Sequence, residues 1–120
     1  MNIEEVREYA LSKKGTTEGF PFGADVLVLK VMGKMFLLMS LSSEPFSVNL
    51  KMDMELVEDY REKYPDVQPG YHMNKKMWNT VYFGNGNIPR KDLQWMIDHS
   101  YDEVVKGLTK KLREELNQLI

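Results

Sequence analysis

The feature that most constrains this chain is a pair of apolar runs joined by a two-residue turn. Residues 24–32 and 35–41 are rich in Val, Leu and Met, and Gly33-Lys34 lies between them. Glycine at the first of two turn positions is typical of a type II′ β-hairpin. Two lysines and the glycine interrupt the stretch, so it lacks the roughly 20 mainly apolar residues of a membrane-spanning helix. The pattern therefore predicts two antiparallel strands.

Two capping-box patterns predict where helices begin. Asn2 and Glu5 have the required spacing, and apolar residues at helical spacing follow them. We therefore expect a helix over residues 3–14. Ser100 and Glu103 repeat the pattern, so a new helix is expected to begin at Ser100 and to end near residue 107.

The remaining turn residues and apolar runs predict a mixed succession of elements. They are a loop over 16–23 whose Phe20-Pro21-Phe22-Gly23 tetrad anchors rings on the core, a strand over 46–51, a helix over 54–63 capped by Asp53, a turn-rich connection over 66–70, a second hairpin with strands 71–73 and 77–83, a helix over 90–99, and a C-terminal helix with Leu112, Leu116 and Leu119.

These elements predict a single α+β domain over residues 1–120. Its order is helix, three strands, helix, two strands and then helices, and consecutive hairpins imply an antiparallel sheet of about five strands with helices on one face. Hydrophobic residues make up 42% of the chain and charged residues 28%, a balance typical of a globular domain. The acidic start of the chain lacks the features of a signal peptide, so we expect a cytoplasmic protein without membrane association.

Several classes of chemistry lack the residues that they require. The chain has no cysteine, which excludes thiol catalysis and Cys-based metal sites. The two histidines, His72 and His99, lie far apart in sequence without paired ligand spacing. The glycine-rich loop over 84–87 lacks the third glycine of a dinucleotide motif and the lysine of a P-loop. We therefore expect no catalytic residue, no cofactor and no metal site.

One segment, residues 71–81, concentrates groups that contact nucleic acids. Lys75 and Lys76 lie at its expected turn, where cations pair with phosphates, and aromatic and asparagine side chains flank them. The alternative is an ordinary hairpin in which Trp78 is buried and the lysines are solvated. The distribution of charge agrees with a nucleic-acid-binding face in this part of the chain. Residues 1–70 have a net charge of −4, whereas residues 71–120 have a net charge of +2.

The chain resembles the MmcQ/YjbR family of small bacterial proteins over nearly its whole length. The residues that carry the resemblance are Pro21-Phe22-Gly23, Lys30-Val31, Gly33-Lys34-Met35-Phe36, Leu50-Lys51, Tyr64-Pro65, the run from Pro69 to Lys76, Trp78-Asn79-Thr80-Val81, Ser100-Tyr101 and Val104-Val105. The residue before the tryptophan is commonly histidine in this family and is Met77 here, which removes a ring contact or ligand. The resemblance implies a frataxin/CyaY-like fold with a double-wing DNA-binding motif.

The predicted function is therefore non-enzymatic DNA binding, weak, salt-sensitive and driven by phosphate contacts at a basic hairpin. Two alternatives remain: an adaptor that binds a protein or a small ligand, and a metal-handling protein by analogy with the frataxin-like fold. Lys51 and Lys34 contribute to the DNA face if the hairpin tips converge. The candidate DNA-binding residues are Tyr71, His72, Asn74, Lys75, Lys76, Trp78, Asn79, Arg90, Lys91, Lys51 and Lys34.

Overall fold

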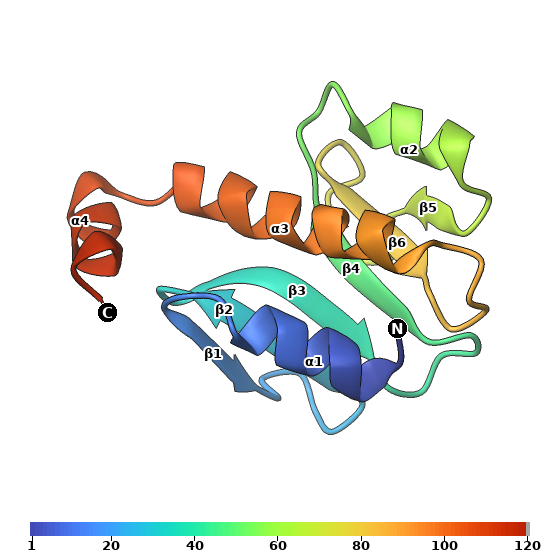
Figure 1. The fold of residues 1–120 in the computed structure, drawn as a ribbon, viewed down its shortest axis with the longest axis horizontal. Coiled ribbons are helices and arrows are strands. Elements are labelled where there is room, and N and C mark those ends of the chain that lie inside the picture. Colours follow the sequence, from blue (N-terminus) through green and yellow to red (C-terminus); the bar gives the residue numbers. More distant parts are fainter. Residues whose placement is uncertain (120) are drawn as a thin grey trace.

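The computed structural model describes residues 1–119 as a six-stranded antiparallel sheet with four helices (Figure 1). The strands lie in the order β1-β2-β3-β4-β6-β5, so most neighbours in the sheet are also neighbours along the chain. The elements are α1 (Ile3–Leu11), β1 (Thr16–Gly19), β2 (Val26–Val31), β3 (Lys34–Ser40), β4 (Ser47–Lys51), α2 (Val57–Lys63), β5 (Val67–Pro69), β6 (Trp78–Tyr82), α3 (Arg90–Lys106) and α4 (Lys110–Gln118). No helix in the described part of the chain is long and apolar enough to cross a membrane.

Helices cover one face of this sheet, and the main hydrophobic core lies between them and the strands. A bulge shifts the register of β2 against β3 between Leu29 and Lys30, so that Phe36 and Leu37 both belong to this core although they are consecutive. Burial of each such side chain stabilises the fold by about 1.5–3 kcal/mol. Large side chains that are fully buried here are Leu29, Phe36, Leu37, Met39, Leu50, Leu93, Met96 and Ile97.

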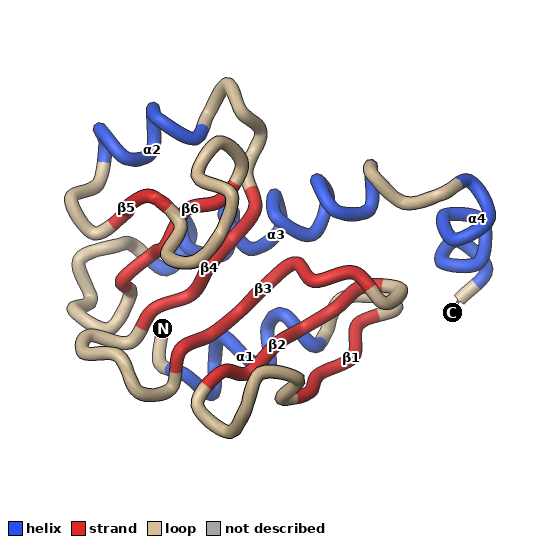
Figure 2. The backbone as a smooth tube through the Cα atoms, turned by 180° about the vertical axis from the view of Figure 1, so that it is seen from behind, coloured by secondary structure: helices blue, strands red, loops and turns tan. Residues whose placement is uncertain are grey.

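Within residues 1–119 no helix covers the opposite face, and Figure 2 shows the strands in front of the helices from that side. A smaller cluster of Val28, Leu38 and Trp78 is buried there, and Met73 and Met77 pack against it. These two methionines belong to the loop over residues 70–77 between β5 and β6, so this loop lies on the sheet rather than beyond its edge. We call this side of the sheet the open face.

The first hairpin forms as expected, with its turn displaced by one residue. Val31 pairs with Lys34, which leaves Met32 and Gly33 as the two turn residues. Both have positive φ, 49° and 82°, as a type I′ turn requires. The type II′ prediction over Gly33-Lys34 was therefore wrong, because a methionine adopts the left-handed conformation here. Met32 is held in it by a hydrogen bond from its amide to the Gly15 carbonyl.

The predicted helix boundaries need three corrections. The capping box of Asn2 and Glu5 is present, but α1 ends at Leu11 rather than at residue 14. α2 begins at Val57, because residues 54–56 form a turn held by Asp53. α3 runs unbroken through Ser100, where a new helix was predicted. The Ser100 hydroxyl is fully buried and donates to the Phe36 carbonyl, so it joins α3 to β3 instead of capping a helix.

The structure has six strands where about five were predicted, because two short edge strands were missed. β1 replaces the first part of the predicted loop over 16–23, and β5 occupies part of the expected connection over 66–70. Residues 71–73 do not form a strand; they lie in the long loop that joins β5 to β6. The rings of Phe20 and Phe22 are 52% and 63% exposed, so they do not anchor on the core.

Candidate functional site

The alternation of strand residues determines which side chains reach the open face. Paired residues of neighbouring antiparallel strands point to the same side of a sheet. Starting from Leu38, which pairs with Val28 and Asn49, the register places every second residue of the strands on this face, except at the bulge, where Met35 takes the place of Phe36. Its central positions are Val26, Val28 and Lys30 on β2, Met35, Leu38 and Ser40 on β3, Ser47, Asn49 and Lys51 on β4, and Trp78, Thr80 and Tyr82 on β6.

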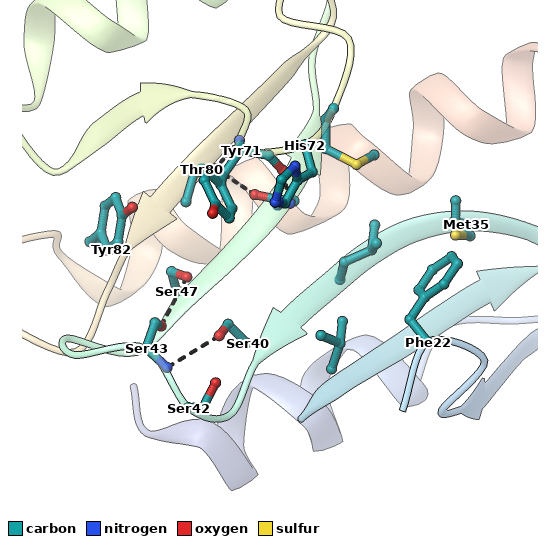
Figure 3. Close-up of a pocket in the computed structure, with 14 residues that line it drawn as sticks. Phe22, Met35, Ser40, Ser42, Ser43, Ser47, Tyr71, His72, Thr80 and Tyr82 are labelled. Carbon is teal, nitrogen blue, oxygen red and sulfur yellow. Dashed lines mark hydrogen bonds between the residues drawn. The ribbon is translucent and has the colours of Figure 1, made fainter. Parts of the chain in front are cut away.

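A groove of about 700 Å³ opens on this face (Figure 3). Phe22 and Met35 lie on one side of it, while Tyr71 and His72 lie on another side, over β4. Such a volume is in the range of sites that hold small molecules in proteins. Four serines, Ser40, Ser42, Ser43 and Ser47, line the end where β3 turns into β4.

The Tyr71–His72 side of the groove is positioned by polar side chains of the sheet. The Thr80 hydroxyl accepts a hydrogen bond from the Tyr71 amide at 2.9 Å and donates to Asn49 Oδ1 at 2.5 Å. Asn49 Nδ2 in turn donates to the Tyr71 carbonyl at 3.2 Å. His72 has a positive φ of 58°, and its ring centroid lies 4.0 Å from that of Tyr71. Three hydrogen bonds thus fix where the two rings enter the groove.

The charges of the strands are unevenly distributed between the two faces. Glu18 is the only carboxylate in the six described strands, and Arg7 of α1 binds it at 2.6 Å on the helix side. This guanidinium holds the pKa of the Glu18 carboxyl below its usual value. Lys30 and Lys51 are therefore the only ionised side chains that the strands present to the open face. Lys75 and Lys76 are exposed on the adjoining loop.

The structure brings only some of the predicted DNA-binding residues together. Tyr71, His72, Asn74, Lys75 and Lys76 share the 70–77 loop, and Lys51 pairs with Trp78 at the end of β4 beside it. The Lys75 ammonium donates to the Gly70 carbonyl at 3.2 Å, and Asn74 Oδ1 accepts from the Lys76 amide at 3.0 Å. Lys76 is the lysine of this loop whose ammonium makes no hydrogen bond within the described residues.

Arg90, Lys91 and Lys34 do not join this group. Arg90 begins α3 and binds Glu5 of α1 at 2.6 Å, an ion pair that lowers the pKa of the Glu5 carboxyl. Lys34 follows the β2–β3 turn, whose Met32 packs near Gly15. That turn and the start of α3 lie at opposite ends of α3 in Figure 1. Lys34 was expected to contribute only if the hairpin tips converge, and they do not: one tip packs against the Gly15 turn and the other folds back over the sheet.

Two predicted contact residues are buried and hold the fold instead. Trp78 is 8% exposed beneath Met73 and Met77. Asn79 points to the covered face and is 1% exposed: its Oδ1 accepts from Arg61 Nε at 2.7 Å, and its Nδ2 donates to the Val57 carbonyl at 3.1 Å. Asn79 thus fastens α2 to β6. Neither side chain is accessible to DNA in this conformation, so both are removed from the candidate site.

Comparison with known proteins identifies the family. A family model described as YjbR matches residues 11–103. This chain belongs to the YjbR family. The Escherichia coli K12 protein YjbR is 31% identical over 119 residues, covering 99% of this chain and 100% of that protein. The YbdF protein of Escherichia coli O157:H7 is 43% identical over 93 residues, which are 77% of this chain and 75% of YbdF.

Solved structures of relatives have the same fold. The crystal structure of the Deinococcus radiodurans protein DR2400, a DUF419 domain, has a TM-score of 0.89 at 34% identity and covers 97% of this chain and 88% of that one. A crystal structure from Pseudomonas syringae has a TM-score of 0.72 at 29% identity, with 83% of this chain and 96% of that chain covered. Both Escherichia coli relatives are described as uncharacterised, so YjbR membership supports the fold and assigns no activity.

The groove itself was missed by the sequence reasoning. Phe22 was expected only to anchor its ring on the core. A usable signal was present in the strands: small polar residues such as Ser40, Ser47, Asn49 and Thr80 alternate with large apolar ones. That alternation marks a sheet face that no helix covers.

Proposed function

We propose that this YjbR-family chain is a non-enzymatic protein that binds DNA weakly through the open face and the 70–77 loop. The observation that carries the proposal is the charge of this face: the described strands present Lys30 and Lys51 to it and no carboxylate, and Lys75 and Lys76 are exposed on the adjoining loop. Phosphates pair with lysines without regard to base sequence. Because the net charge of the chain is −2, few other basic side chains are available to contact phosphates. We therefore expect a dissociation constant on the order of 10⁻⁴ to 10⁻⁶ M at physiological salt.

The aromatic side chains of the same face favour single strands over duplex. Tyr71 is 67% exposed and Phe22 is 63% exposed, and both border the groove. Unpaired bases stack on such rings, whereas the bases of a duplex are already stacked on one another. An open sheet with helices behind it also presents a surface on which a flexible strand can lie.

The proposal is tested by fluorescence anisotropy with a labelled single-stranded oligonucleotide and its duplex at low salt. If all four lysines contact phosphates of a single strand, log K falls against log salt with a slope of about −3. Lys75→Glu with Lys76→Glu is expected to abolish binding. The matched control is Lys110→Glu with Lys111→Glu, which makes the same charge change at exposed positions of α4 and should bind as wild type does.

Thermal melts show whether each double variant remains folded, since exposed substitutions usually change stability by less than about 0.5 kcal/mol. If both double variants bind equally, or if wild type shows no salt-sensitive binding to either oligonucleotide, the proposal is wrong.

A second candidate, an adaptor that binds a small ligand, is favoured by the groove. An apolar contact loses little affinity with salt, so a salt titration separates it from phosphate binding. The metal-handling alternative has less support. Within residues 1–119, no three His, Asp or Glu side chains come together in a way that could hold a metal ion.

A further inference from the structure

The groove on the open face has two chemically different ends. At one end Phe22, Val26, Met35 and Leu38 present apolar side chains. At the other end four serines lie around the β3–β4 turn, with Tyr82 beside them (Figure 3). A ligand that fills such a groove has an apolar body and a polar end, because each part then meets surface of its own kind.

The hydroxyls of the polar end are only partly used by the protein. Ser43 is fully engaged: its amide donates to Ser40 Oγ at 3.2 Å, and its hydroxyl meets the Pro45 carbonyl at 3.0 Å and Ser47 Oγ at 3.2 Å. Ser40 accepts in this network, which leaves its own proton to donate. Ser42 and Tyr82 make no side-chain hydrogen bond within the described residues. Three O–H donors therefore remain for a ligand.

The charges on the open face indicate which kind of polar group a ligand would place at the polar end of the groove. No Asp or Glu lines it, although the chain has 18 such residues. Glu44 is the carboxylate nearest in sequence to the serines, and it lies outside the lining residues. Lys and Arg are likewise absent from the described lining, and a hydroxyl can donate to a carboxylate or accept from an ammonium group. The lysines that the strands present to the same face, Lys30 and Lys51, attract an anion and repel a cation, so they favour the carboxylate. Hydrogen bonds to an ionised acceptor are roughly twice as strong as neutral ones.

We propose that the groove of the open face is a binding site for a small organic anion: a carboxylate held by Ser40, Ser42 and Tyr82, on an apolar body held between Phe22 and Leu38. This site does not depend on DNA binding. It uses the hydroxyls of Ser40, Ser42 and Tyr82 around the β3–β4 turn, whereas the DNA proposal depends on the lysines of the open face and of the 70–77 loop.

The test compares three probes with one apolar body and different ends: 4-phenylbutyrate, 4-phenylbutan-1-ol and 4-phenylbutylamine. Binding to the full chain is followed by amide chemical shifts in NMR spectra. We expect the carboxylate to bind about tenfold more tightly than the amine, with the alcohol between them. The shifted amides should belong to residues 40–47 and to β2 and β3. If the amine binds as tightly as the carboxylate, if no probe binds at millimolar concentration, or if the shifts lie elsewhere, the proposal is wrong.

Substitutions at each end of the groove test the contributions of the polar and the apolar end separately. Ser42→Ala with Tyr82→Phe is expected to reduce the affinity for the carboxylate about tenfold and to reduce that for the alcohol by less, because hydrogen bonds to a neutral hydroxyl are weaker. Phe22→Ala, at a 63% exposed ring, should weaken all three probes alike. The control Lys75→Glu with Lys76→Glu should retain carboxylate binding. If this variant loses DNA binding but still binds the carboxylate, the two sites are separate. Failure of the DNA proposal can then be told apart from failure of the carboxylate proposal.

Discussion

The covered and open faces of the sheet are made by the same strands, yet they differ in nearly every physical property. On the covered face, Leu29, Leu37 and Met39 are fully buried beneath two helices. On the open face, a small apolar cluster around Leu38 is surrounded by serine, threonine, asparagine and lysine side chains. The comparison shows which residues stabilise the fold and which are available for binding.

Polar groups also serve different purposes on the two faces. On the covered face, Asn79 and Ser100 are buried, and each joins a helix to a strand. On the open face, Thr80 and Asn49 hold the loop that forms one side of the groove. Thr80 is itself buried, at 3% exposure, but its partner residue Tyr71 is 67% exposed. The hydrogen bonds of Thr80 and Asn49 therefore shape a surface, whereas those of Asn79 and Ser100 lie inside the core and are needed for stability.

The largest expected effect compares two consecutive leucines. Leu37→Ala removes a side chain with 0% exposure from the covered face and should destabilise the fold by about 3–5 kcal/mol, because a closed cavity is left. Leu38→Ala makes the same change at 8% exposure on the open face and should cost only about 2 kcal/mol, since the groove beside it already admits solvent. Urea unfolding measures both values. Equal costs would show that the open face is as much a part of the core as the covered face.

A second pair tests the polar groups. Asn79→Ala leaves Arg61 Nε without its acceptor and removes the side-chain donor to the Val57 carbonyl, so it should destabilise the fold by about 1–3 kcal/mol. Thr80→Val keeps the shape of its side chain, and its two partners belong to the exposed Tyr71 and the half-buried Asn49, where water can replace the lost hydroxyl, so it should cost less than about 1 kcal/mol. Its effect is expected to be local, because the Tyr71 amide loses its acceptor and should exchange with solvent faster. A Thr80 variant with global destabilisation as large as that of Asn79→Ala would contradict the division between faces.

Much of this architecture could be predicted from the sequence, because its strongest elements are defined by local patterns. The apolar runs that form β2 and β3, and the capping box of Asn2 and Glu5, depend on residues close together in the chain. β1 could not be predicted in the same way. Its four residues Thr-Thr-Glu-Gly have little apolar pattern, and they are a strand because β2 supplies hydrogen-bonding partners.

Where the sequence misled, tertiary contacts overrode a local signal. Ser100 and Glu103 have the spacing of a capping box, but Ser100 is used by the Phe36 carbonyl and the Lys51 amide, which lie far away in sequence. The same holds for the candidate site. The expected turn identified Lys75 and Lys76 as exposed. Only the fold shows that Asn79 points to the covered face, and that the serines of the β3–β4 turn and Tyr71 line the same groove.

The smallest expected effect concerns alkaline pH and two tyrosines outside the open face. Burial, together with a hydrogen bond from each hydroxyl to Asp98 or Asp92, raises the pKa of Tyr9 and of Tyr64 to about 12. Because each pKa is higher in the folded state than the usual value of 10, the stabilisation is complete below pH 10 and is lost as the pH rises toward 12. Each tyrosine should contribute on the order of 1 kcal/mol after allowance for its partial exposure. Tyr9→Phe with Tyr64→Phe should therefore make the loss of stability between pH 10 and pH 12 shallower, measured by urea unfolding at each pH. The control Tyr71→Phe, at an exposed ring of the open face, should keep the wild-type steepness, and an equal change in both variants would refute this assignment.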